Sequence, residues 1–270
     1  MADPADLELL VRPAQPGGTG VLVLAGSSGA LEVDRSRLLA AHGATALALR
    51  WFGGPGQQPA PYEVPLEIFI EALDRLTPYV DRLTVLGSSF GAEAALLTAC
   101  HDPRVTGVVA LAPTPVVWAG VAPEGRVTSH WTRHGAPVPF VAFDEAWEPD
   151  TDPPAYVGQY RASLLTHRRM VPAATIPVEQ TAAELVLVGG EDDQVWPGAD
   201  FARALATRRH EGGAPTTVLT HPDAGHRVVL PGESPLERGL SMARGGTPEA
   251  DEALGRLAWP HVVRVLGLRE

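Results

Sequence analysis

The sequence predicts an α/β protein whose central sheet is mostly parallel and doubly wound. Short apolar runs rich in Val and Leu recur along the chain. Most of these runs are continuous rather than alternating, which is typical of strands buried on both faces of a parallel sheet. Segments with helical periodicity separate the runs, and regular alternation of strands and helices favours a doubly wound sheet.

The apolar runs are the expected strands of this sheet. They span residues 7–12, 21–26, 45–51, 83–88, 107–113, 184–190 and 216–221. The segments between them that carry helical patterns are the expected helices. They span residues 33–42, 65–79, 90–101, 198–209 and 247–266.

Two of these helices carry prolines that bear on their bounds. Pro65 suits the first position of the helix over 65–79, because a helix leaves its first backbone N–H groups without partners. Thr247 can cap the last helix, and Pro248 fits its first turn. Pro260 lies further inside, where it is expected to kink or interrupt that helix.

Residues 114–183 break the rhythm of strand and helix. They form about seventy residues without a clear strand, and connections of that length are usually functional or have structure of their own. Several aromatic side chains lie in this insert, including Trp118, Trp131 and Tyr160. A lid over a binding site and a helical excursion packed on the sheet both remain open. The 270 residues are expected to form a single domain over 1–270, with 114–183 inserted in it.

Composition excludes several classes of function. The chain has no lysine, so all 21 basic residues are arginine. A lysine Schiff base and a phosphate-binding P-loop are therefore excluded. The net charge of −11 argues against a nucleic-acid binder, which must neutralise phosphates. The single cysteine, Cys100, supports neither a disulfide framework nor a metal cluster, and no metal or cofactor is predicted.

The sequence also carries an expectation about location. No window approaches the ~20 apolar residues that a membrane span needs. The first residues, MADPADLELL, are acidic and do not resemble a signal peptide. We expect a cytoplasmic protein.

The stretch GSSFG, residues 87–91, follows an expected strand and opens an expected helix. Its G-x-S-x-G spacing in that context is typical of a nucleophile elbow. The turn is tight enough to require glycine two residues before and two residues after the nucleophile. Ser89 is therefore the candidate nucleophile, and Ser88 occupies the variable position.

A serine nucleophile needs a base, and the base needs an acid. His226 lies just after the last expected strand, where the chain order Ser, Asp, His places the histidine. His221 is its nearest rival, but it falls at the end of the strand itself.

The acid is expected in GGEDDQVWP, residues 189–197, after the penultimate strand. Glu191, Asp192 and Asp193 compete there. The G-x-x-D-x-x-x-P spacing from Gly190 to Pro197 favours Asp193, with Asp192 as the alternative. Either aspartate could instead cap the helix that begins near residue 198.

An oxyanion hole should accompany these side chains. One donor is expected to be the backbone N–H of Phe90, the residue after the nucleophile. The second is expected in the early loop AGSSGALE, where Ser27 is favoured and Ser28 is next.

With these residues placed, the chain resembles the α/β-hydrolase domain of acyl-CoA thioesterases and bile acid-CoA:amino acid N-acyltransferases over most of residues 18–268. The resemblance is carried by GALEVDRSRLLAAHGATALALRWF, GSSFGAEAALLTA, SHWTRHGAPVPFV, GGEDDQVWP and DAGHRVVLP. It implies an α/β-hydrolase fold with an insert between the family's sixth and seventh strands. It also implies that Ser89, Asp193 and His226 match the positions of the family's catalytic triad.

Two departures from the family pattern refine this expectation. Only ~20 residues precede the strand at 21, whereas an immunoglobulin-like sandwich takes about 100, so the family's N-terminal domain of that type is not expected. The family's amino-acid transferases tend to use cysteine as nucleophile, whereas this chain has Ser89. Serine favours water as the acyl acceptor.

The leading hypothesis is a serine hydrolase of an acyl thioester or ester, with CoA or an acyl carrier protein as possible carriers. An acyltransferase that uses an amine or alcohol acceptor is the first alternative. A catalytically silent α/β-hydrolase that serves as a binding module is the second. The dense basic spots Arg168/Arg169 and Arg208/Arg209 are candidates for contact with CoA phosphates, or are solvated surface charge.

Overall fold

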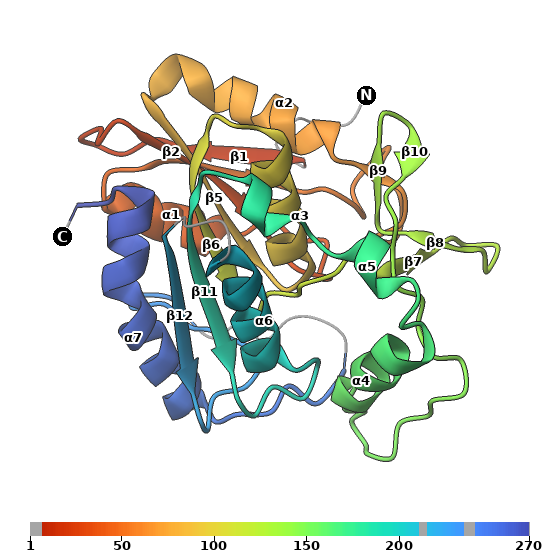
Figure 1. Cartoon of the computed structure of the whole chain (residues 1–270). Helices are drawn as coiled ribbons and strands as arrows, with labels where there is room; N and C mark the ends of the chain where they lie inside the picture. Colours follow the sequence, from red (N-terminus) through yellow and green to blue (C-terminus); the bar gives the residue numbers. More distant parts are fainter. Residues whose placement is uncertain (1–6, 211–214, 235–240, 270) are drawn as a thin grey trace.

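A computed structural model describes residues 7–210, 215–234 and 241–269 of the chain. Its centre is a seven-stranded sheet in the order β1-β3-β2-β5-β6-β11-β12 (Figure 1). The bounds of its strands lie within two residues of the seven apolar runs: β1 Glu8–Val11, β2 Thr19–Leu24, β3 Thr45–Leu49, β5 Arg82–Ser88, β6 Val105–Leu111, β11 Glu184–Gly190 and β12 Thr216–His221. β1 is antiparallel to β3, and the other neighbours in this sheet are parallel. The prediction of a mostly parallel sheet is confirmed.

Helices cover both faces of the sheet, as a doubly wound fold requires. α1 (Val33–Ala41) and α7 (Pro248–Leu266) pack on one face, where Leu39 and Leu254 join one hydrophobic cluster. α2 (Glu67–Leu76), α3 (Phe90–His101) and α6 (Gly198–His210) pack on the other face. No helix in the described part of the chain is long and apolar enough to span a bilayer.

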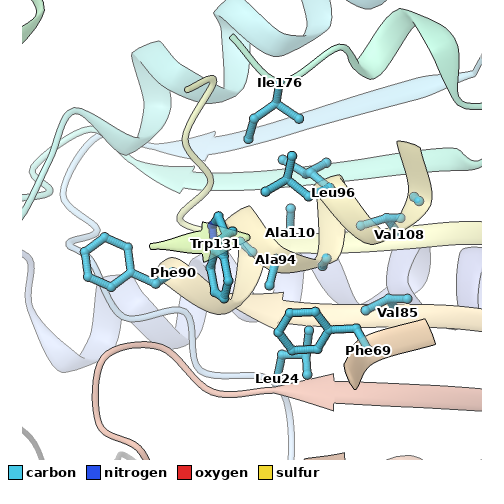
Figure 2. Packing of buried hydrophobic residues seen from close by; sticks show 14 of the residues in the cluster. Leu24, Phe69, Val85, Phe90, Ala94, Leu96, Val108, Ala110, Trp131 and Ile176 are labelled. Carbon is cyan, nitrogen blue, oxygen red and sulfur yellow. The ribbon is translucent and has the colours of Figure 1, made fainter. Parts of the chain in front are cut away.

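The main core surrounds α3. Every residue of this helix from Phe90 to Ala99 is buried, because β5 and β6 lie beneath it and the insert covers it. Figure 2 shows Ala94 and Leu96 of α3 among side chains from β5, β6 and the insert residues Trp131 and Ile176. A helix that is apolar all round must be enclosed in this way. The start of α3 is therefore fixed by packing on every side.

Residues 114–183 connect β6 to β11, which are the fifth and sixth strands of the sheet in chain order. The expectation that this insert lacks strands is wrong in detail. Four short strands lie in it, together with α4, α5 and a 3₁₀ turn: β7 Ala119–Val121, β8 Val127–Ser129, β9 Trp131–Arg133, β10 Ala136–Pro137, α4 Val157–Thr166, α5 Val171–Ala174 and η3 Val178–Gln180. Strands of two or three residues are too short to show a periodic pattern in the sequence.

Two expectations about proline are also corrected. Pro65 does not begin α2; it belongs to the two-residue strand β4 (Val64–Pro65), which pairs with β9, and the helix begins at Glu67. Pro260 does not interrupt α7, which continues through it to Leu266. The packing of α7 on β6, β11 and β12 outweighs the hydrogen bond that proline removes.

Candidate active site

Ser89 lies at a sharp corner between β5 and α3. Its φ is +56°, in the region that residues other than glycine rarely adopt. A Cβ added at Gly87 would lie 2.0 Å from the carbonyl oxygen of Gly91, and one added at Gly91 would lie 2.4 Å from the carbonyl oxygens of Leu24 and Ala25. The two glycines of the motif are therefore required by the close approach of backbone to backbone, as the sequence predicts.

Three predicted side chains form a hydrogen-bonded series. His226 Nε2 lies 3.0 Å from Ser89 Oγ, and His226 Nδ1 lies 2.8 Å from Asp193 Oδ2. Asp193 is buried, whereas Ser89 and His226 are half-buried and reach a cavity. They follow β5, β11 and β12, so the carboxyl edge of the parallel sheet brings them together from distant parts of the chain.

The three acids that compete in the sequence have separate partners. Glu191 pairs with Arg203, and Asp192 accepts from the side chain of Gln194 and the N–H of Gly246. Asp193 Oδ1 accepts from the N–H groups of Val195 and Trp196, at 2.8 and 3.2 Å, which leaves Oδ2 for His226. Of the three, only Asp193 contacts the histidine.

His221, the rival histidine, is at the end of β12 and points elsewhere. Its Nδ1 accepts from the N–H of Asp223 at 3.2 Å, and the two residues form part of the turn that leads to His226. The structure thus places His226, and not His221, beside Ser89.

A cavity of about 890 Å³ opens above the serine. The early loop, the residues after His226 and helix α4 contribute to its wall, including Leu31, Val229, Tyr156 and Tyr160. Trp118 and Trp131 of the insert are instead fully buried in the core. Helix α4 of the insert thus lines the cavity, while Trp118 and Trp131 contact Glu93 of α3; a lid role for the insert stays a prediction.

Ser27 and Phe90, the two predicted oxyanion donors, also line this cavity. Within the described residues, neither of their N–H groups has a hydrogen-bond acceptor. Gly26 brings the early loop close to the corner, since a Cβ added there would lie 2.9 Å from Ser89 Cβ. The loop and the corner are thus neighbours, as two donors of one oxyanion hole need to be.

Residues that the sequence did not single out hold the histidine from behind. The segment 242–247 is here named the strap. The carbonyl of its Arg244 accepts a hydrogen bond from the backbone N–H of His226, and the N–H of its Gly246 donates to the side chain of Asp192. Asp251, at the start of α7, accepts from the N–H of Gly225 at 2.8 Å. Burial raises the pKa of the Asp251 carboxyl to about 6. Only a structure could reveal this role, because the strap has no motif.

A second polar group lines the cavity at Ser88. Arg35 donates from Nη1 to Ser88 Oγ at 2.7 Å and forms a two-pronged pair with Glu233, at 2.5 and 2.9 Å. The side chains of Arg35 and Glu233 are only 6% and 8% exposed. Burial opposes the charge of Arg35, but Glu233 and Glu32 outweigh it and raise its pKa. No signal of this pair is visible in the sequence, because the helix of Arg35 also holds Asp34, Ser36 and Arg37.

Glu93, four residues after Ser89, ties α3 to the insert. It is fully buried and accepts from the indole N–H of Trp131 at 2.6 Å and from the backbone N–H of Trp118 at 3.2 Å. The ring of His130 lies edge-on against Phe90, with centroids 4.2 Å apart. The insert therefore buttresses the residue that follows the nucleophile.

Cys100 and Arg209 are not available for chemistry in the cavity. Cys100 is half-buried near the far end of α3, and burial raises the pKa of its thiol to about 12. Arg209, expected on the surface, is buried and donates to the carbonyls of Val178, Thr181 and Ala183. Among the residues described, no three His, Cys, Asp or Glu side chains are grouped as a metal site would require.

Solved structures share this fold at low sequence identity. A protein described as a dienelactone hydrolase from Klebsiella pneumoniae superposes with a TM-score of 0.58 over 96% of this chain and 92% of its own, at 16% identity. Est1E from Butyrivibrio proteoclasticus, with ferulic acid bound, gives a TM-score of 0.54 over 95% of each chain, at 14% identity. The chain therefore has the α/β-hydrolase fold.

Curated relatives align with nearly all of the chain. Acyl-coenzyme A amino acid N-acyltransferase 2 of Mus musculus is 27% identical over 267 residues, which cover 94% of this chain and 61% of that protein. Acyl-coenzyme A thioesterase 6 of Homo sapiens is 25% identical over 286 residues, which cover 97% and 62%. The chain spans about three fifths of the length of these relatives.

A family model agrees with the fold, the relatives and the sequence resemblance. The model described as BAAT / acyl-CoA thioester hydrolase C terminal matches residues 64–264. That range includes the corner at Ser89, the insert, Asp193 and His226. On this match, the chain belongs to the BAAT / acyl-CoA thioester hydrolase C-terminal family.

Proposed function

We propose that this protein is a serine hydrolase that cleaves an acyl thioester or ester through an acyl-enzyme. The observation that carries the proposal is the series Ser89–His226–Asp193, with its distances of 3.0 and 2.8 Å at the mouth of a cavity. Membership of the family and relatives named acyl-coenzyme A thioesterases support a thioester as substrate.

Acylation would begin at Ser89. Its Oγ attacks the acyl carbonyl carbon, while His226 Nε2 takes the hydroxyl proton. Asp193 holds the other ring nitrogen, Nδ1, and stabilises the imidazolium that forms. The negative oxygen of the tetrahedral intermediate would accept from the N–H groups of Phe90 and Ser27. Collapse of the intermediate breaks the bond to the thiolate or alcohol, which leaves with the proton from His226.

Deacylation would repeat these steps with water. His226 removes a proton from water as the oxygen attacks the ester carbonyl on Ser89. The second tetrahedral intermediate expels the serine oxygen, which recovers a proton from His226. The product is a carboxylic acid, and the enzyme returns to its starting state.

Labelling with a fluorophosphonate probe, together with a substrate panel, tests the proposal. The panel contains acyl-CoAs, acyl-N-acetylcysteamines, p-nitrophenyl esters and an acyl carrier protein loaded with an acyl group. We expect the wild type to be labelled and to hydrolyse at least one member, and Ser89→Ala to do neither while it keeps its folded circular dichroism spectrum. Absence of labelling in the wild type would favour a silent binding module.

An acyltransferase is the second candidate, because relatives named acyl-coenzyme A amino acid N-acyltransferases align with 94% of this chain. The acyl-enzyme would then pass its acyl group to an amine rather than to water. A single assay with an acyl-CoA and increasing glycine or taurine separates the two. We expect free acid as the main product, and a conjugate that dominates at millimolar amine would contradict hydrolysis.

A further inference from the structure

The wall of the cavity beside the nucleophile carries an unusual polar array. Ser88, Arg35 and Glu233 all line the cavity, and Arg35 joins the other two. A buried ion pair is often no more stable than apolar residues of the same volume. Stability alone therefore gives no reason for a guanidinium and a carboxylate in the wall of an acyl pocket.

The array leaves two neighbouring donors unused. Ser88 Oγ accepts from Arg35 Nη1, so its own hydrogen is free to donate, and it donates to no described residue. A guanidinium has five N–H groups. In Arg35, Nε and Nη2 donate to the two oxygens of Glu233, and Nη2 also donates to the carbonyl of Val228 at 3.5 Å. Nη1 donates one N–H to Ser88 Oγ. The second N–H of Nη1 has no acceptor in the described part of the chain. Because Nη1 and Ser88 Oγ are 2.7 Å apart, both donors can reach one oxygen.

The charges around the array select the kind of oxygen. Glu233 occupies both prongs of the Arg35 fork, and Glu32, which also lines the cavity, acts on the same guanidinium. A carboxylate bound at this array would face two carboxylates, Glu233 and Glu32, for the one arginine of the array; the other arginines of the cavity wall, Arg227 and Arg244, are not part of it. A neutral oxygen accepts from the two donors without that repulsion.

We propose that Ser88 and Arg35 form a polar subsite, which binds a hydroxyl or oxo oxygen on the acyl group of the substrate a few bonds from the reacting carbonyl. The preferred substrate is then an oxygenated acyl thioester or ester rather than a plain alkyl one. Glu233 positions Arg35 and neutralises it. This subsite rests on the proposed function, because the acyl group must first be placed on Ser89.

Hydrolysis of matched short thioesters tests the subsite. The panel is butyryl-, 3-oxobutyryl-, 3-hydroxybutyryl-, 4-hydroxybutyryl- and succinyl-N-acetylcysteamine, so that the chain length is constant and only the oxygen varies. We expect the wild type to prefer at least one neutral oxygenated substrate over butyryl in kcat/KM. Ser88→Ala should lower kcat/KM for that substrate by about 3- to 10-fold, the value of one hydrogen bond, and should lower it for butyryl by a clearly smaller factor.

Matched variants separate recognition from folding. Ser88→Thr keeps the hydroxyl and should therefore retain the preference for the oxygenated substrate that Ser88→Ala loses. Ser36→Ala is the control, because Ser36 is buried on the same helix as Arg35, does not line the cavity, and its hydroxyl has no hydrogen-bond partner among the described residues. The pair Arg35→Met with Glu233→Leu leaves no unpaired buried charge, and it should lose the preference mainly through KM.

Two results would overturn the subsite while leaving the proposed function intact. One is an equal loss on butyryl and oxygenated substrates in Ser88→Ala. The other is a wild-type preference for butyryl or for the carboxylate of the succinyl substrate. Failure of the proposed function looks different, since no thioester would then be hydrolysed in a Ser89-dependent way.

A binding measurement gives a second readout that needs no turnover. Calorimetric titration of Ser89→Ala with the butyryl and 3-hydroxybutyryl thioesters should show tighter binding of the hydroxylated ligand. Adding Ser88→Ala to that background should remove the difference. Equal affinities for both ligands in Ser89→Ala would contradict the subsite.

Discussion

Ser89 has a backbone conformation that costs about 1–3 kcal/mol for a residue with a side chain. Gly87 and Gly91 make this conformation possible, because a Cβ atom at Gly87 would lie only 2.0 Å from a backbone oxygen, and one at Gly91 only 2.4 Å. Ser88, its neighbour, points to Arg35 instead of His226. Two adjacent serines thus face different partners, and only one of them can pass a proton to the histidine.

We therefore expect Ser89→Ala to remove turnover, because loss of the nucleophile leaves only residual catalysis. Ser88→Ala should keep turnover of a simple butyryl thioester. Steady-state rates for both purified variants provide the comparison. The reverse pattern, with Ser88→Ala inactive and Ser89→Ala active, would mean that the elbow is assigned in the wrong register.

The two aspartates give a second prediction at this scale. Asp193→Asn should lower kcat by about 10⁴-fold, because an amide in its place holds the wrong tautomer of the histidine. Asp192→Asn should be much milder, since Asp192 contacts Gly246 and Gln194 rather than His226. The kcat values of the two variants show which aspartate is the acid that holds His226. Similar losses in both variants would leave the acid unassigned.

Sequence reasoning works at this scale where a motif fixes backbone geometry. The glycines around Ser89 and the order Ser, Asp, His both depend on the strands that precede them, so they could be predicted. The pair between Arg35 and Glu233 could not, because 198 positions separate its members and neither belongs to a motif. The burial of Arg209 was missed for a similar reason, since its carbonyl acceptors lie in an irregular segment.

At the scale of elements, α7 and the strap complete the site from outside the sheet. The strap lies backbone to backbone against its neighbours, since a Cβ at Gly245 would lie 1.6 Å from the carbonyl oxygen of Asp192. Asp251 lies 8% exposed at the start of α7, with Asp193, Arg227 and His226 acting on its charge. The helix itself was evident from Thr247 and Pro248 in the sequence, whereas its contact with Gly225 depends on how it docks.

The raised pKa of Asp251 predicts a dependence of stability on pH. Its pKa is about 6 in the folded protein against 3.8 for a free aspartate, so the folded state binds more protons between these values. The contribution of Asp251 to the free energy of unfolding is thus fully present below about pH 4, and it is lost as the pH rises through about 6. Asp251→Asn keeps an acceptor for Gly225 and stays neutral. It should raise the free energy of unfolding at pH 8 by up to about 3 kcal/mol, from 1.36 kcal/mol per pKa unit.

Urea unfolding at pH 4 and pH 8 measures this effect. The advantage of Asp251→Asn should be present at pH 8 and absent at pH 4, where the native carboxyl is already protonated. Glu252→Gln is a suitable control, because Glu252 is exposed on the same helix and lies 3.4 Å from Arg256. An equal change at both pH values would contradict the assignment.

At the scale of the whole molecule, charge bears on the carrier of the acyl group. The net charge of −11 opposes a polyanion such as CoA, so its binding needs a local basic surface. Arg168 and Arg169 are exposed just after α4, the helix whose Gln159 and Tyr160 line the cavity. The other basic spot is not equivalent, since Arg208 pairs with Glu179 and Arg209 is buried.

Replacing both exposed arginines, Arg168→Glu with Arg169→Glu, should raise KM for an acyl-CoA several-fold if they meet its phosphates. KM for the matching acyl-N-acetylcysteamine, which has no nucleotide, should change little. In the wild type, added salt should weaken only the CoA substrate. Equal changes for both substrates would exclude a phosphate contact and favour a small ester or thioester.

The strap also bears on the order in which this protein becomes active as it is made. A nascent chain that has emerged as far as residue 230 already contains Ser89, Asp193 and His226. It lacks the Arg244 carbonyl and the Asp251 carboxylate that hold the loop of the histidine. Because Ser89 and His226 are 137 positions apart, their contact forms slowly and depends on late docking. We expect catalytic competence to appear only after α7 has been synthesised and packed, well after the sheet has acquired its strands.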